Sequence, residues 1–258
     1  MVRGLYTAYT GLVNQQKRLD VVSNNLANSA TTGYKKEGCT TQSFDEVMAT
    51  KVKDSSEAYV NRNIGNLTLG AKIGETYTNY DQGSFKNTGN TLDLALSGEG
   101  FFAISFTSKD GVTSTKYTRD GSFTMTKEGN LVTKDGDFVL NDGGSEIIIP
   151  TNASEITVNE LGDIYADGEY VDTLSLVDFE DKNYLTKYGE NMYDTVEGYQ
   201  ISDDKPTVVQ GYLEMSNVNV VSEMVDMITI SRTFEANQKL VNAIDDSLAK
   251  TVQLGSVK

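Results

Sequence analysis

Apolar side chains recur every seven residues near both ends of the chain. The N-terminal series is Leu5, Leu12, Leu19 and Leu26, and the C-terminal series is Met227, Phe234, Val241 and Leu248. Each series spans about four heptads, the length at which a coiled-coil interpretation becomes reasonable. The two segments therefore predict helices that pack against each other, with the rest of the chain between them.

The N-terminal helix is expected over residues 3–28. A second apolar stripe, formed by Tyr6, Tyr9 and Val13, runs along another part of this helix, so we expect more than one packing partner. The asparagine, threonine and glycine residues that follow, as far as Gly33, are typical of a helix end.

The C-terminal helix is expected over residues 222–252. Ser222 is the predicted N-cap, and Glu223 and Asp226 suit the positive end of the helix dipole. The first two turns are apolar nearly all round, at Met224, Val225, Met227, Ile228 and Ile230. A helix of this kind must be buried on more than one side. Because its N-terminal partner covers only one side, other subunits are expected to cover the rest.

Residues 76–215 predict β structure. Asp-Gly pairs at 110–111, 120–121, 135–136 and 167–168 are strong hairpin signals, because glycine accepts a positive φ at the second turn position. Short β-like runs lie between the turn signals, at 92–96, 101–106, 122–126, 130–133, 147–149 and 174–179. This pattern predicts a meander of antiparallel strands.

The predicted fold class is therefore α+β. Residues 1–33 and 217–258 are expected to form a helical core domain, with the two ends paired like a coiled coil. Residues 34–75 are expected to form an extended hairpin or linker, whose polar stretch 51–66 is an exposed loop or hairpin arm. Residues 76–216 are expected to form the inserted antiparallel β domain.

The charge is concentrated in the middle of the chain. The 258 residues carry a formal net charge of -15, yet residues 1–30 contain three basic residues and one acidic residue. Nucleic acid and anionic membrane surfaces are therefore poor partners. No apolar run is long enough to span a membrane, and the N-terminus lacks the pattern of a cleaved signal peptide.

Catalytic chemistry has little support in the sequence. The chain has no histidine, so the commonest general base and the commonest transition-metal ligand are missing. Cys39 is its one cysteine. Carboxylate pairs such as Asp203-Asp204 and Asp245-Asp246 are interpreted as solvated surface. We predict no catalytic residue, no metal site, no cofactor and no small-molecule substrate. The competing class is a secreted β-domain adhesin or enzyme, which would bind glycan or show activity through residues 76–215 alone.

Four stretches of the chain together resemble the axial proteins of the bacterial flagellum, in particular the rod proteins of the basal body. They are NNLANSATTGYKK at 24–36, QG at 82–83 with TGN at 88–90 and LDLALSGEGFF at 92–102, YTRDGSF at 117–123 with GNLVT at 129–133, and GYLEMSNVNVVSEM at 211–224 with RTFEAN at 232–237. Tyr34 stands where Phe is more usual. The motif residues assigned to the site are Asn24, Asn25, Leu26, Asn28, Gly33, Ser216, Asn217, Val218 and Asn219.

The resemblance implies a helical core domain made of both termini, stacked around a hollow axis, with the β domain facing outward. The expected function is a structural rod subunit that polymerises into a hollow helical drive shaft, transmits torque from motor to hook and forms part of the export channel. The implied partners are copies of the chain, neighbouring rod and hook proteins, the flagellar type III export gate, and ring or bushing proteins. The implied location is the basal body in the cell envelope, reached without a cleaved signal peptide.

Two finer expectations come from the same resemblance. Phe44 and Met48 fit the element that rod and hook proteins present to the export gate; the alternative is an ordinary amphipathic turn. Within the family, the chain length and the stretch between Lys36 and Gln82 favour the distal rod protein. The ending Asp245-Asp246-Ser247-Leu248 is closer to the proximal rod paralogue, and a hook-type axial paralogue is the remaining alternative.

Overall fold

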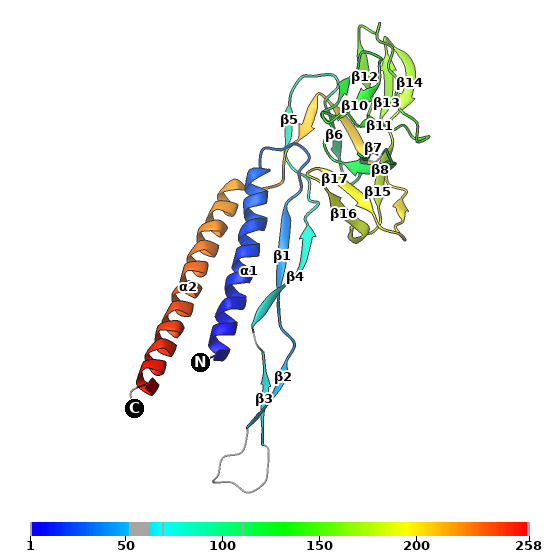
Figure 1. Ribbon diagram of the computed structural model, residues 1–258. Helices are drawn as coiled ribbons and strands as arrows, with labels where there is room; N and C mark the ends of the chain where they lie inside the picture. Colours follow the sequence, from blue (N-terminus) through cyan, green and yellow to red (C-terminus); the bar gives the residue numbers. More distant parts are fainter. Residues whose placement is uncertain (1, 52–61, 69, 110, 257–258) are drawn as a thin grey trace. The chain divides into compact units, whose positions relative to one another are not determined.

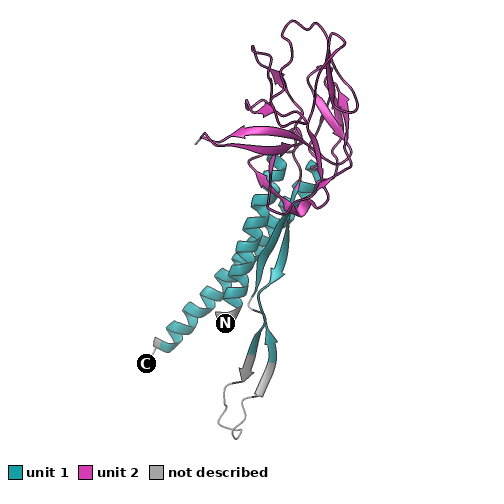
Figure 2. Ribbon diagram, turned by 90° about the vertical axis from the view of Figure 1, so that its right-hand side faces the viewer, with its two compact units in different colours: residues 1–27, 37–79, 219–258 teal, residues 28–36, 80–218 magenta. Residues whose placement is uncertain are grey.

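The computed structural model describes residues 2–51, 62–68, 70–109 and 111–256. The chain forms two compact units (Figure 2). Residues 1–27, 37–79 and 219–258 make up the helix–hairpin unit, and residues 28–36 and 80–218 make up the β unit. The described chain has two long helices, one at each end, and antiparallel strands between them, so the predicted α+β class is confirmed.

The two helices, α1 (Val2–Ala27) and α2 (Val220–Ser256), lie side by side and run antiparallel (Figure 1). A Cβ added to Gly4 would lie 3.6 Å from Ile244 Cδ1, and a Cβ added to Gly11 would lie 3.1 Å from Asn237 Nδ2. Seven residues forward along α1 therefore correspond to seven residues backward along α2. The same register continues to the other end of the pair, where Asn25 Nδ2 donates a hydrogen bond to Glu223 Oε2.

The N-terminus of α2 differs from the prediction. Asn219 Oδ1 accepts hydrogen bonds from the backbone N–H groups of Val221 (3.1 Å) and Ser222 (3.2 Å), so Asn219 is the N-cap and the assignment to Ser222 is wrong. Asparagine caps as well as serine does, because its short side chain also reaches the free N–H groups of the first turn. The helix consequently begins at Val220, two residues earlier than expected.

Two pairs of antiparallel strands form the hairpin. The first pair is β1 (Glu37–Ser43) with β4 (Ala71–Thr78), and the second is β2 (Val47–Lys51) with β3 (Arg62–Leu67). Helix α1 contacts β1 and β4 as well as α2, so it lies between α2 and the hairpin (Figure 1). Most of the predicted exposed arm, residues 52–61, lies outside the described residues.

The β unit is built from short strands, and all of their pairings are antiparallel. The largest sheet has the order β16-β17-β8-β7-β11-β10-β9, with β15 also paired to β7 and β18 to β15; smaller sheets are β12-β13-β14, β19-β6 and β20-β5. The bounds are β5 Phe85–Asn87, β6 Leu94–Ser97, β7 Phe101–Thr107, β8 Thr113–Thr118, β9 Thr124–Met125, β10 Leu131–Val132, β11 Phe138–Val139, β12 Ile156–Val158, β13 Asp163–Ala166, β14 Glu169–Thr173, β15 Leu176–Phe179, β16 Leu185–Tyr188, β17 Met192–Thr195, β18 Ile201–Ser202, β19 Thr207–Gln210 and β20 Tyr212–Glu214, with a 3-10 turn at Lys182–Tyr184.

One Asp-Gly pair shows why these dipeptides predict hairpins. Asp167 (φ 52°) and Gly168 (φ 86°) both have positive φ and connect β13 to β14, which are the conditions for a two-residue type I′ turn. The strand predicted at 147–149 is wrong, because this segment forms only an isolated bridge between Ile148 and Asn130. Its apolar pattern instead reflects burial, since Ile147 and Ile149 are almost fully enclosed.

Strand β7 separates two hydrophobic cores in the β unit. Phe102 and Ile104 face a large cluster, and Phe101 and Ala103 face a smaller, aromatic-rich one. Successive side chains of a strand point to opposite faces, so β7 is buried on both sides. The large core contains Leu94, Leu96, Phe102, Ile104, Phe123, Leu131, Val139, Ile147, Ile149, Ile164, Ala166, Leu174, Leu176 and Val208, and the small core contains Phe101, Ala103, Tyr117, Leu140, Phe179, Leu185 and Tyr193.

Candidate functional site

The eight side chains predicted to hold the helices together share one degree of burial. All of them are half-buried, and they are Leu5, Leu12, Leu19, Leu26, Met227, Phe234, Val241 and Leu248. Ala8 and Ile230 are the fully buried apolar side chains of the described helices. The facing sides of α1 and α2 therefore contact each other but leave part of each of these eight side chains accessible.

The second apolar stripe of α1 is exposed. Tyr6, Tyr9 and Val13 are 59%, 60% and 40% accessible, although the sequence suggested that this stripe would find a packing partner. The hairpin packs beside this stripe, on the side of α1 where Asn14 and Asn25 are buried, and leaves the three side chains largely accessible. Within the described chain, the stripe is only partly covered.

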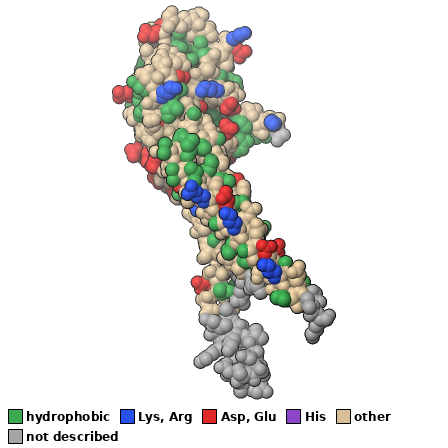
Figure 3. Space-filling model, turned by 90° about the vertical axis from the view of Figure 1, so that its left-hand side faces the viewer, with side chains coloured by type: hydrophobic (Ala, Val, Ile, Leu, Met, Phe, Trp, Pro, Cys, Tyr) green, Lys and Arg blue, Asp and Glu red, His purple; other side chains and the backbone are tan. Residues whose placement is uncertain are grey.

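The start of α2 also exposes apolar side chains. Four of them, at Val221, Met224, Val225 and Ile228, are between 49% and 72% accessible. Hydrophobic side chains are visible on the face of the molecule that carries α2 (Figure 3). The all-round apolar start of this helix is therefore only partly covered by its own chain, as the sequence suggested.

Asn25 joins three elements of the helix–hairpin unit. Its Nδ2 donates to the Glu37 carbonyl at 2.8 Å and to Glu223 Oε2 at 3.2 Å, while its Oδ1 accepts from Glu37 N–H at 2.9 Å. The side chain is 1% accessible, so these bonds are shielded from water. The motif asparagine thus connects the end of α1 to β1 and to the first turn of α2.

A buried ionic cluster lies in the β unit, centred on Glu214. Its carboxylate accepts from Lys35 Nζ at 2.6 Å and from Arg119 Nη1 at 3.1 Å, and all three side chains are at most 2% accessible. Gly83 N–H donates to the same carboxylate at 2.8 Å. Arg119 also donates to the Gly98 carbonyl at 2.9 Å. Each of the four stretches that resemble the flagellar family supplies at least one of these residues.

The cluster continues into the backbone around it. Lys35 Nζ donates to the Asp81 carbonyl at 2.8 Å, and Asn217 Nδ2 donates to the same carbonyl at 3.0 Å. Asn217 Oδ1 accepts from Lys36 N–H at 2.7 Å. The segments before β1 and before α2 are thereby bound to one point of the β unit. Burial lowers the pKa of Lys35 below its usual value, and the neighbouring Glu214 carboxylate opposes that shift.

Gly33 is required by the same arrangement. Its φ is 68°, a left-handed conformation that favours glycine, and its N–H donates to the Glu214 carbonyl at 2.8 Å. A Cβ at this position would lie 2.6 Å from the Arg119 carbonyl carbon, closer than side chains approach backbone. Glycine at position 33 therefore allows the segment before β1 to lie close to the backbone at Arg119.

The predicted site residues therefore fall into separate groups. Asn24, Asn25, Leu26 and Asn219 belong to the helix–hairpin unit, while Asn28, Gly33, Ser216, Asn217 and Val218 belong to the β unit. Lys35, Arg119 and Glu214 were missed. The signal for them was present, since each lies inside a family stretch, but Lys, Arg and Glu are expected on the surface unless paired.

The proposed export-gate element is partly exposed. Phe44 is 36% accessible and precedes β2, and Met48 is 63% accessible and pairs with Asn66 of β3. Residues 47–48 are therefore in a strand and do not form the amphipathic turn that was the alternative. Among the described residues, no group of three or more His, Cys, Asp or Glu side chains could hold a metal ion, and no helix is long and apolar enough to cross a membrane.

Comparison with known proteins identifies the family. Three family models match: "Flagella basal body rod protein" over residues 5–35, "Flagellar hook protein FlgE/F/G D1 domain" over 95–166, and "Flagellar basal body rod FlgEFG protein C-terminal" over 209–254. The flagellar basal-body rod protein FlgG of Bacillus subtilis is 34% identical, over 98% of this chain and 99% of its own length. FlgG of Agrobacterium fabrum is 34% identical over 95% of this chain and 96% of its own length, and FlgF of Caulobacter vibrioides is 31% identical over the whole of both chains. The chain therefore belongs to the flagellar basal-body rod protein family.

Proposed function

We propose that this chain is a structural subunit of the flagellar basal-body rod, and that it polymerises with copies of itself into a hollow helical drive shaft. The observation that carries the proposal is the incomplete burial of the helix–hairpin unit in a member of the rod family. The eight apolar side chains predicted to hold α1 and α2 together, called the seam from here on, are half-buried, and two further apolar stripes are exposed. Exposed apolar surface of this kind is typical of an interface with other subunits.

The paired ends of the chain supply the core of the shaft in this proposal. The seam from Leu5 to Leu26 packs against the seam from Met227 to Leu248 in the manner of a coiled coil, and neighbouring copies cover the remaining faces. Contacts that do not close a ring generate a helical tube, which can carry torque along its axis and leave a channel for export. The motif residues around Asn25 and Asn217 hold the two ends of the chain in place.

The distal rod is the proposed position within the flagellum. The chain aligns with FlgG of Bacillus subtilis over nearly the full length of both proteins, which supports this assignment. The proximal rod and a hook-type axial role are the alternatives within the family. The proposed partners are neighbouring rod and hook proteins, ring or bushing proteins, and the type III export gate, for which Phe44 and Met48 are the candidate contact. We also propose that the chain is exported without a cleaved signal peptide and is located in the basal body.

A direct test is cryo-EM of basal bodies isolated from cells that make this protein with an epitope tag. The expected result is a tagged helical tube at the hook-proximal end of the rod, with α1 and α2 next to the channel. A tag found outside the basal body, or β-unit binding to glycan after both helices are deleted, would contradict the proposal.

A further inference from the structure

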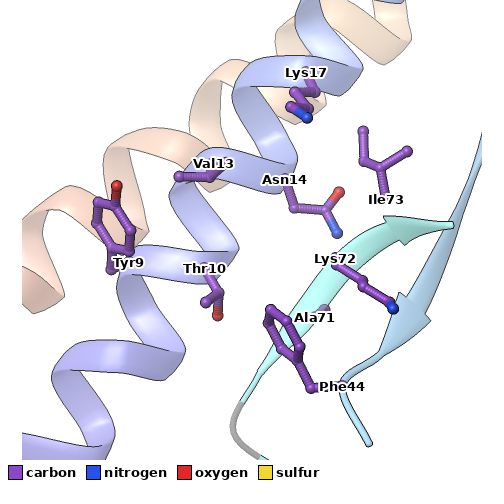
Figure 4. Close-up of a pocket in the computed structure, with 9 residues that line it drawn as sticks. All are labelled: Tyr9, Thr10, Val13, Asn14, Lys17, Phe44, Ala71, Lys72 and Ile73. Carbon is purple, nitrogen blue, oxygen red and sulfur yellow. The ribbon is translucent and has the colours of Figure 1, made fainter.

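A groove lies between α1 and the hairpin (Figure 4), and its volume is about 280 Å³. Its apolar lining comes from Tyr9, Val13, Phe44 and Ile73. This volume is at the small end of the range for binding pockets. The groove therefore suits a few side chains from a protruding segment of another molecule.

Two lysines supply the charge of this groove. Lys17 comes from α1 and Lys72 from β4 (Figure 4), and they are the charged residues of the lining. Both are exposed, and neither forms an ion pair in the described part of the chain. The occupant of the groove should therefore present apolar side chains next to one or more carboxylates.

The β unit carries an exposed apolar patch around the loop 196–200, which connects β17 to β18. Four side chains, between 39% and 53% accessible, form this loop patch: Tyr184, Val196, Tyr199 and Ile201. Val196 N–H donates to the Tyr184 carbonyl at 2.9 Å, so these two residues are neighbours. The Tyr199 ring centroid lies 5.7 Å from that of Phe179, and Ile201 pairs with Phe179 across β15 and β18. The loop patch is therefore the outer margin of the smaller, aromatic-rich core.

Two carboxylates border the loop patch. Glu197 belongs to the loop, and Glu180 N–H donates to the Gln200 carbonyl at 3.2 Å, which places Glu180 beside the loop. Both carboxylates are exposed, and neither forms an ion pair within the described residues. The neighbouring Lys182 is bound to Glu99 Oε2 at 2.6 Å. The loop patch thus combines apolar side chains with negative charge that has no partner in the described chain.

We infer that the groove of one copy receives the loop patch of a neighbouring copy. The apolar side chains of the loop patch then lie against the apolar lining, and its two carboxylates lie beside Lys17 and Lys72. The inference rests on the proposed function, since it specifies one contact of the polymer. Complementary charge of this kind fixes how two surfaces are oriented and disfavours like-charged alternatives.

The exposed apolar stripe at the start of α2 is a poorer occupant of the groove. Arg232 is exposed and lies four residues after Ile228, on the same side of the helix. The stripe of a neighbouring copy would therefore bring a third positive charge to Lys17 and Lys72. The loop patch brings two negative charges instead, which is why the charges favour it.

The proposed contact joins two different surfaces. Lys17 and Lys72 of the groove and Glu197 of the loop patch are all accessible in the single chain. Each copy can therefore offer its groove to one neighbour and its loop patch to another. A contact of this heterologous kind, when it does not close a ring, repeats into an open assembly.

Cysteine cross-linking of the full chain tests this contact. In a Cys39→Ser background, Val13→Cys places a thiol in the groove and Val196→Cys places one on the loop patch. Under mild oxidation, a mixture of the two single variants should form a disulfide-linked dimer, and each variant alone should form none. A chain that carries both substitutions should form a ladder of covalent oligomers, because each copy can link to two neighbours. A disulfide within one chain, in place of the ladder, would overturn the inference.

The matched control is Ile148→Cys, an exposed apolar position of the β unit. Ile148 bridges to Asn130 next to β10, towards the opposite end of the largest sheet from β17. Mixed with Val13→Cys, this control should give no dimer, and equal cross-linking of the control would overturn the inference. A dimer with Val225→Cys but none with Val196→Cys would place the start of α2 in the groove and overturn it as well.

Sedimentation of the same samples separates this inference from the proposed function. Polymers that form without the expected cross-link refute this contact only. Samples with neither polymers nor cross-link refute the proposed function as well.

A charge exchange gives a second test. One variant carries Lys17→Glu and Lys72→Glu, and the other carries Glu180→Lys and Glu197→Lys. Each should raise the concentration needed for polymerisation by about tenfold, because like charges then meet across the contact. A chain with all four substitutions restores the contact in reversed polarity and should recover most of the loss.

The control for the changed net charge is Glu128→Lys with Glu155→Lys, two exposed carboxylates of the β unit outside the loop patch. It should polymerise like the unsubstituted chain. A control as weak as the Glu180→Lys, Glu197→Lys variant would overturn the inference, because the loss would then come from overall charge. A chain with all four substitutions that remains as weak as either pair would show that these residues do not meet.

Discussion

The two units differ in how completely they bury their apolar side chains. In the β unit, Phe101, Phe102 and Ile147 are fully enclosed. In the described part of the helix–hairpin unit, Ala8 and Ile230 are the buried apolar side chains, while Val221 and Leu254 are 72% and 79% accessible. The β unit therefore contains a complete core. The helix–hairpin unit carries a core pattern that the described chain leaves incomplete.

Both units also bury polar side chains, some of them with atoms that have no hydrogen-bond partner within the described residues. The β unit buries Glu214 with two cationic partners and a backbone donor. The helix–hairpin unit buries Asn14 with its Oδ1 unpaired. A buried polar group is tolerated when its hydrogen bonds are satisfied and is costly when they are not. Unpaired buried atoms occur in both units, since Arg119 Nε and Asp178 Oδ1 of the β unit also lack a hydrogen-bond partner in the described chain, so the contrast between the units rests on their apolar side chains.

Hydrogen exchange of the monomer should show the largest contrast. Amides of β7 and β8 should exchange slowly, because they open only with the whole β unit. Amides over residues 5–26 should exchange faster by several orders of magnitude, since a helix pair with half-buried seams gains little to offset chain entropy. The measurement is amide exchange by mass spectrometry on monomeric and assembled protein. Strong protection of residues 5–26 in the monomer would contradict the comparison.

Glu214→Gln should weaken the β unit more than any change on its surface. The substitution keeps the shape of the side chain but leaves Lys35 and Arg119 as buried cations without a counter-charge. Breaking a buried pair in this way costs about 3–5 kcal/mol. Urea unfolding followed by the near-UV circular dichroism of the tyrosines measures the loss. Glu128→Gln, an exposed carboxylate of the same unit, should change the free energy of unfolding by about 0.5 kcal/mol or less.

Charges in the helix seam should separate assembly from folding of the β unit. Leu19→Asp or Phe234→Asp places a carboxylate at a half-buried apolar position, so the α1–α2 pair and its polymer should be lost. Far-UV circular dichroism should fall at 222 nm, while the urea midpoint of the β unit stays unchanged. Ser23→Asp, on the exposed side of α1, is the control for added charge. Normal filaments from either seam variant would refute the role of the seam.

The sequence predicted long-range features of the fold where a regular pattern existed. The heptad positions identified α1 and α2, and Asp167-Gly168 identified a hairpin turn. The pattern could not assign the N-cap, because Asn219 and Ser222 have similar capping preferences and only the backbone path decides between them. It also misjudged residues 147–149, because buried apolar residues in an irregular segment resemble a short strand.

The candidate site was predictable only in part. Asn25 and Gly33 could be assigned from the family stretches, but their roles depend on Glu223 and on the Glu214 carbonyl, which are distant in sequence. Lys35 and Glu214 are 179 residues apart. A local pattern carries no information on such a pair, because burial of a charge depends on the partner that the fold brings to it. The exposed stripes, by contrast, were visible in the sequence as apolar positions without an assigned partner.

The smallest predicted effect is a loss of β-unit stability at alkaline pH. Burial, followed by the neighbouring Tyr199, raises the pKa of Tyr117 to about 12. The unfolded chain releases this proton near pH 10, so its contribution to stability is present below about pH 10 and is lost between about pH 10 and pH 12. The slope is at most about 1.4 kcal/mol per pH unit.

Urea midpoints of the β unit across this range should fall less steeply for Tyr117→Phe than for the unsubstituted chain, whereas Tyr184→Phe, at an exposed position, should leave the slope unchanged. An equal slope for Tyr117→Phe would mean that this hydroxyl does not lose its proton with unfolding, and that the smaller core of the β unit is open to water.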